Sequence, residues 1–134
     1  MKTFWAVSVA LLISSVIVGP VAARDLKDKV HVEVDNTVME PGMAPGTYVC
    51  SGGHLHVKGT VQNQADVPLR HVKVVGKAFD ANGKLLGTAT ATTETEKLAP
   101  GEKTEIDVEF PTVTGAAVAH VKRRDLTVVE APSL

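Results

Sequence analysis

The chain has 134 residues and a formal net charge of −1, and aromatic residues make up only 4% of it. Its only basic cluster, Lys122-Arg123-Arg124, is followed at once by Asp125. This composition excludes nucleic acid as a partner, because nucleic-acid binding needs a basic surface or aromatic side chains on which bases stack.

Residues 1–23 have the composition of a secretory signal peptide. Lys2 supplies the positive charge, an apolar run covers residues 4–18, and Val21-Ala22-Ala23 places small residues at a cleavage position. The run is close to the lower limit of about 17 residues for a membrane span, so an uncleaved anchor is the alternative. In that case only this segment contacts the membrane. We expect a secreted or periplasmic protein.

Several segments alternate apolar and polar residues with the period of a strand that buries one face. In chain order they are residues 30–34, 54–61, 71–74, 88–92 and 105–110. Residues 117–129 are predicted as a final strand, long enough to contain a bend. No helix is predicted after residue 23.

Turn residues separate these strands. Asp80-Ala81-Asn82-Gly83 predicts a tight hairpin, and Leu98-Ala99-Pro100-Gly101-Glu102 predicts another between the next two strands. Pro111 is expected to end the strand before it, and Phe79 and Phe110 are expected to be the largest core residues. We therefore predict an all-β protein, an antiparallel immunoglobulin-like β-sandwich of about seven strands. Its predicted parts are the signal peptide, an N-terminal strand with a Pro/Gly-rich connection (24–47) and the sandwich domain (48–134).

Four motifs follow one another from residue 54 onward. They are Val57-x-Gly59-x-Val61-x-Asn63, Gly76-Lys77-Ala78-Phe79-Asp80, Asn82-Gly83-Lys84-Leu85-Leu86, and Leu98-x-Pro100-Gly101-Glu102 with Ile106-x-Val108. In this order the chain resembles the FxLYD family of small extracytoplasmic domains. The second motif occupies the position of the F-x-L-Y-D motif that gives the family its name, and only Asp80 is identical to that motif. The resemblance implies a β-sandwich of about seven strands and no catalytic residues.

Catalytic motifs of hydrolases are missing from the sequence after residue 23. The serines there are Ser51 and Ser133, and Ser51 lies in Cys50-Ser51-Gly52-Gly53, which differs from the G-x-S-x-G motif of serine hydrolases. Cys50 and His54 are near one another but lack a cysteine-hydrolase signature. We expect no enzymatic activity and no cofactor.

A metal site is one interpretation of residues 39–56. His54 and His56 are two apart on a strand, so they point to the same face. Cys50, Met39 and Met43 precede them, and sulfur with imidazole suits copper. In the other interpretation both histidines are the polar half of an alternating strand. The single cysteine excludes internal disulfides, and we expect Cys50 to be buried as a small hydrophobic residue.

The leading functional interpretation is a non-enzymatic secreted or periplasmic β-sandwich that serves as an interaction or assembly module. Its partner is expected to be an envelope or extracellular protein, or a second copy bound through an edge strand, since edge strands expose unpaired N–H and C=O groups. The weakly charged segment Thr88–Thr95 is predicted to be such an edge. The alternative is a small periplasmic copper-binding protein that uses His54 and His56 with Cys50 or Met43.

Overall fold

The computed structural model describes residues 24–134, and the predicted signal peptide lies outside them. In chain order the elements are η1 (Lys27–Lys29), β1 (Val30–Val34), β2 (Thr47–Val49), β3 (His54–Asn63), β4 (Lys73–Phe79), β5 (Leu85–Thr92), β6 (Lys103–Thr114), α1 (Ala116–His120) and β7 (Arg123–Glu130). Within the described residues, no helix has the length and apolar character needed to cross a membrane.

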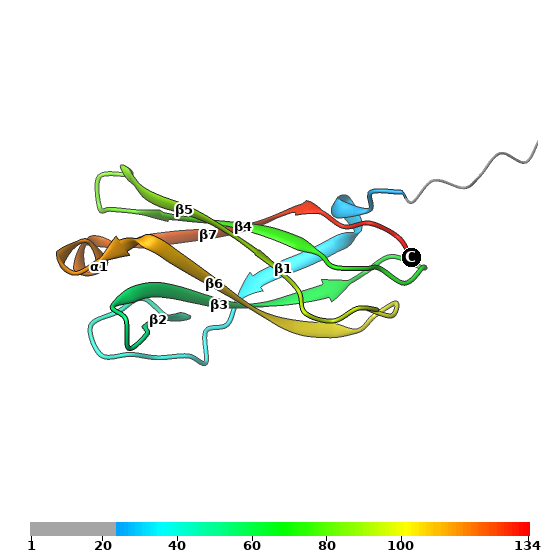
Figure 1. The fold of residues 1–134 in the computed structure, drawn as a ribbon, viewed down its shortest axis with the longest axis horizontal. Helices are drawn as coiled ribbons and strands as arrows, with labels where there is room; N and C mark the ends of the chain where they lie inside the picture. Colours follow the sequence, from blue (N-terminus) through cyan, green and yellow to red (C-terminus); the bar gives the residue numbers. More distant parts are fainter. Residues whose placement is uncertain (1–23) are drawn as a thin grey trace, which may run out of the picture.

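The seven strands form two antiparallel sheets, which lie one above the other in Figure 1. In one sheet, β3 pairs with β1 and then β2 along one edge and with β6 along the other. The second sheet has the order β5-β4-β7. This arrangement confirms the prediction of an antiparallel, all-β sandwich of seven strands.

Strand β3 has one face in the core and the other on the outer surface of its sheet. Its residues alternate between half-buried and buried along the whole strand. Leu55, Val57 and Val61 are fully buried between the sheets, whereas His54 and His56 lie on the opposite side. Because side chains alternate along a strand with a period of two, a slip of one residue would exchange these two faces.

Asn63 is fully buried at the end of β3 and holds two connections in place. Its Nδ2 donates hydrogen bonds to the carbonyl oxygens of Val67 (2.9 Å) and Leu98 (3.0 Å). Its Oδ1 accepts a hydrogen bond from the N–H of Ala65 at 2.8 Å. A buried amide without such partners is costly, so Asn63 links both connections firmly to the core.

The two predicted hairpin turns differ in the structure. Between β4 and β5, Asp80 Oδ1 accepts hydrogen bonds from the N–H groups of Asn82 and Lys84, both at 2.9 Å, and Gly83 has φ +79°. This hairpin is confirmed. The prediction of a hairpin at Pro100-Gly101 is wrong, because β5 and β6 belong to different sheets. Turn residues determine the local direction of the chain but not the strand that it joins next.

The C-terminal part contains a helix where a strand was predicted. α1 covers Ala116–His120, and the strand expected over residues 117–129 begins only at Arg123. Gly115, with φ +58°, precedes the helix. The prediction that no helix follows residue 23 is therefore wrong. The alanines of this segment favour a helix more strongly than its weak alternation favours a strand.

Pro111 does not end β6, which continues to Thr114. Among the strands that the structure describes, β6 is paired with β3 alone, so it is an edge strand. Proline is tolerated on edge strands because its missing N–H can face away from the ladder. The register between β3 and β6 shifts next to this proline, between His54 and Leu55.

The two phenylalanines of the expected core differ in burial. Phe110 is fully buried and is the largest such side chain in the described residues. Phe79 is only half-buried, and the Arg123 guanidinium lies 4.1 Å from the centre of its ring. The expectation that both are core residues is therefore right for Phe110 alone.

We predict that Phe110→Ala lowers the free energy of unfolding by about 3–5 kcal/mol, because it leaves a cavity in the core. Phe79→Ala is expected to cost clearly less, because solvent and the flexible Arg123 side chain can occupy the vacated space. Urea unfolding of both variants measures the difference. An equal or larger loss for Phe79→Ala would contradict the assigned core.

Candidate functional site

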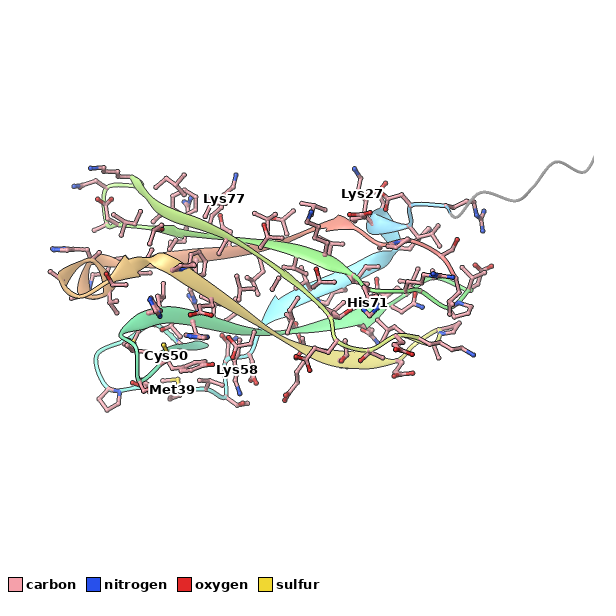
Figure 2. All side chains as sticks on the ribbon, in the orientation of Figure 1. Lys27, Met39, Cys50, Lys58, His71 and Lys77 are labelled. Atoms are coloured by element: carbon pink, nitrogen blue, oxygen red, sulfur yellow. The ribbon has the colours of Figure 1, made fainter. Side chains whose placement is uncertain are left out.

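Polar side chains gather on the outer face of the β2-β3-β6 sheet. They are Tyr48 of β2, Cys50 of the following turn, His54 and His56 of β3, and Asp107 and Glu109 of β6. His56 is the centre of this cluster, because the strand register places it between Tyr48 and Glu109. In Figure 2, Cys50 and Lys58 lie on this layer, away from the layer that carries Lys77.

Cys50 lies in the turn that joins β2 to β3. Its N–H donates to the carbonyl of His54 at 3.1 Å, and its own carbonyl accepts from Gly53 at 2.9 Å. The thiol is half-exposed, with Sγ 3.6 Å from Nδ1 of His54. The expectation that Cys50 is buried as a small hydrophobic residue is wrong, because the chain has already left the sheet when it reaches this position.

His56 is fixed on two sides. Its ring stacks on the Tyr48 ring, with 4.7 Å between the centroids, and only 13% of the side chain is exposed. Its Nδ1 lies 2.9 Å from Asp107 Oδ1, and the Tyr48 hydroxyl donates to the other oxygen of Asp107. An ionised carboxylate only accepts hydrogen bonds, so Nδ1 carries the proton. In the neutral imidazole, Nε2 then holds the free lone pair.

Nε2 of His56 is buried and has no hydrogen-bond partner among residues 24–134. Glu109 Oε1 lies 4.0 Å away. One ligand atom each of Cys50, His56 and Glu109 lie within 4.8 Å of one another. Leaving a buried polar atom without a hydrogen-bond partner lowers the stability of the fold by about 1–3 kcal/mol. A ligand that paired with this lone pair, beside a thiol and a carboxylate, would remove that penalty.

His54 contacts the cluster from its solvent side. Its Nδ1 lies 3.2 Å from Glu109 Oε1, and its side chain is 34% exposed. It therefore contacts two of the three residues that meet around His56 Nε2. His54 and His56 both reach Glu109, in agreement with the single strand face assigned to them from their spacing.

The structure adds residues to the cluster that the sequence analysis missed, and it does not place the methionines in the cluster. Met43 packs against the hydrophobic core, and Met39 is 63% exposed. Glu109, Asp107 and Tyr48 were not identified as site residues. The alternation of acidic residues along β6 was visible in the sequence, but its position opposite His54 and His56 depends on the pairing of β6 with β3.

The cluster shifts the pKa of three of its members. A hydrogen bond from the His54 main chain, together with the His56 and His54 imidazoles, lowers the pKa of the Cys50 thiol to about 7 against the effect of burial. Burial opposes a charge on His56, but Asp107 and Cys50 outweigh it and raise the pKa of His56. Burial and the bond to Asp107 raise the pKa of Tyr48. Near neutral pH the metal-free cluster therefore favours a thiolate beside a protonated imidazole, and a metal ion would have to displace that proton to bind Nε2.

The cluster contains the three side-chain types of a nucleophilic triad. Cys50 corresponds to the nucleophile, His56 to the base and Asp107 to the carboxylate that orients the base. Such catalysis also needs donors that stabilise the negative charge formed on the substrate. Here the Glu109 carboxylate lies beside both imidazoles. Its negative charge disfavours an oxyanion at this place and favours a cation.

No model of a known protein family and no curated protein matches this chain. The resemblance to the FxLYD family therefore stays a prediction. Among solved structures, the chain is similar to a DUF1425 family member from a Shewanella species, with 19% identity over 78% of this chain and 81% of that one and a TM-score of 0.44. It also matches DesR, a β-glucosidase from Streptomyces venezuelae, with 18% identity over 78% of this chain, 15% of DesR and a TM-score of 0.37. Neither similarity carries an argument about function.

We predict that alkylation of Cys50 by iodoacetamide in metal-free protein rises with pH around a midpoint of about 7. The thiolate is the reactive form, and an ordinary cysteine reaches its midpoint near 8.5. His56→Ala is expected to move the midpoint upward, because a neighbour that favours the thiolate is lost. A wild-type midpoint at the ordinary value, unchanged in the variant, would contradict the assigned contacts.

Proposed function

We propose that this protein is a secreted or periplasmic β-sandwich without enzymatic activity that binds a transition-metal ion through Cys50, His56 and Glu109. The observation that carries the proposal is the buried Nε2 of His56, which has no partner among the described residues and lies beside a thiol and a carboxylate. A bound cation would use this lone pair and would be neutralised by the two anionic neighbours.

The spacing of the side chains fits one small ion. Ligands held about 2.0–2.3 Å from a tetrahedral zinc ion lie roughly 3.3–3.8 Å from one another. In the structure, His56 Nε2 is 4.0 Å from Glu109 Oε1, and His54 Nδ1 is 3.2 Å from the same oxygen. Small movements of side chains at the surface are therefore enough to close the site. His54 contacts Glu109 and Cys50 from the solvent side but lies outside the group whose ligand atoms are all within 4.8 Å of one another.

The donor set favours zinc(II) over copper(I). The sequence pattern of sulfur and imidazole suggested copper, and the addition of Glu109 changes the chemistry. Cys, His and Glu together are common ligands of zinc, whereas copper(I) is selected by sulfur ligands and not by carboxylates.

Asp107 and Tyr48 support the proposed ligand His56 without contacting the ion. A histidine that binds a metal commonly donates its other N–H to a carboxylate, which fixes the ring and its tautomer. Here the 2.9 Å contact between His56 Nδ1 and Asp107 supplies that carboxylate. The Tyr48 ring covers one face of the imidazole. The ligand is thus oriented before any ion arrives.

We predict that zinc(II) raises the melting temperature of metal-free protein that lacks residues 1–23. A ligand that binds only the folded state adds about 2.7 kcal/mol at a concentration of 100 Kd. Copper(I), titrated in parallel, is expected to give a smaller shift than zinc(II). Thermal unfolding followed by circular dichroism provides the measurement.

Three variants test the assignment of the ligands. His56→Ala and Glu109→Gln are expected to abolish most of the zinc shift. His31→Ala is the matched control, because His31 lies on β1 with its own carboxylate partner, Glu33, at 3.3 Å. The proposal fails if the wild type shows no shift at excess metal, or if His56→Ala keeps the full shift.

An interaction role does not conflict with metal binding. The proposed metal site occupies the outer face of one sheet, and the edges of the other sheet pair with no further strand of residues 24–134. An envelope or extracellular protein as partner stays a prediction.

A further inference from the structure

Strand β5 forms one edge of the three-stranded sheet, since the strand order is β5-β4-β7. Its residues, Leu85–Thr92, include no charged residue and no proline. Edge strands are commonly protected from pairing with other chains by charges or by proline. β6 carries Glu105, Asp107 and Pro111, and β7 begins with Arg123. β5 lacks both kinds of protection.

The hydrogen-bond pattern shows which groups of β5 face outward. Thr93 N–H donates to the carbonyl of Val72 at 2.9 Å, in the same register that β4 and β5 follow. In an antiparallel pair, residues that exchange hydrogen bonds alternate with residues that do not. Ala91 and Ala89 therefore bond to β4. The main-chain N–H and C=O groups of the residues between them point away from the sheet.

These outward residues are Thr88, Thr90 and Thr92. Their side chains are exposed on the outer face of the sheet. Within residues 24–134, no strand other than β4 pairs with them. β5 thus presents a row of free donors and acceptors, flanked by small, neutral, β-branched side chains.

We propose that two copies of this chain pair through β5, antiparallel about a two-fold axis, and form a continuous six-stranded sheet. An axis perpendicular to the sheet at Ala89 places Thr88 of one copy opposite Thr90 of the other and keeps both outer faces on the same side. Threonine pairs across strands are favourable, and like charges directly opposite are unfavourable. Because β5 carries no charge, two copies of β5 can pair without charge repulsion. Two-fold dimers are also the commonest oligomers.

The nearest charged residues on the same face do not oppose this pairing. Lys77 and Lys73 lie on β4, opposite Thr88 and Thr92. In the proposed dimer three strand spacings of about 4.8 Å separate the two β4 strands. This separation exceeds the screening length of about 8 Å at physiological ionic strength. Asp125 of β7 also lies opposite Lys77 and offsets its charge.

The experiment measures the mass of the protein without residues 1–23 by sedimentation over a wide concentration range. A reductant is present, so that Cys50 cannot link two chains. We expect the wild type to have twice the mass of one chain at high concentration. Thr90→Val is the matched control, because it keeps the outward N–H and the β-branched shape, and it is expected to stay dimeric.

Two variants weaken the edge in different ways. Thr90→Pro removes an N–H that β4 does not use, and Thr90→Glu adds a charge close to its own symmetry mate. Both are expected to raise the dimer dissociation constant at least tenfold with an unchanged far-ultraviolet circular dichroism spectrum. A wild type that stays monomeric at every concentration, or two variants that dimerise as well as the wild type, would overturn the proposal. Metal binding is not involved in either outcome.

Discussion

The alternation of side chains along β3 is the constraint on which the rest of the structure depends. β3 is paired on both edges, and every second residue enters the core while the others face outward. Leu55, Val57 and Val61 are fully buried, so the register of β3 cannot slip by one residue without exposing them. The same constraint fixes His54 and His56 on the outer face. The hydrophobic core and the polar cluster are thus two sides of one strand.

The cluster also depends on the neighbours of β3. Because β2 and β6 flank it, His56 lies between Tyr48 and Glu109 and is oriented by Asp107. These groups lie on strands of one sheet and not on independent loops, which favours a site that is formed before a ligand binds. Cys50 is the exception, because it lies in the turn after β2. A cation bound at His56 would therefore connect this turn to the sheet.

Much of this architecture was predictable from local patterns in the sequence. The alternation around Val57 and Val61 indicated β3, and Asn82-Gly83 indicated the β4–β5 hairpin. Pairings between distant segments were not predictable in the same way. Glu109 is far from His56 along the chain, and no local signal showed that β6 would lie beside β3. For the same reason Pro111 was misjudged, since its effect depends on whether its strand is an edge.

X-ray absorption at the zinc edge of the zinc-loaded protein tests the metal site most directly. The proposed ligands predict one sulfur at about 2.3 Å and nitrogen or oxygen ligands, including imidazole, at about 2.0–2.1 Å. The Cys50→Ser variant is expected to lose the sulfur contribution. A spectrum with oxygen and nitrogen ligands only, identical in the wild type and in Cys50→Ser, would contradict a metal site built from Cys50, His56 and Glu109.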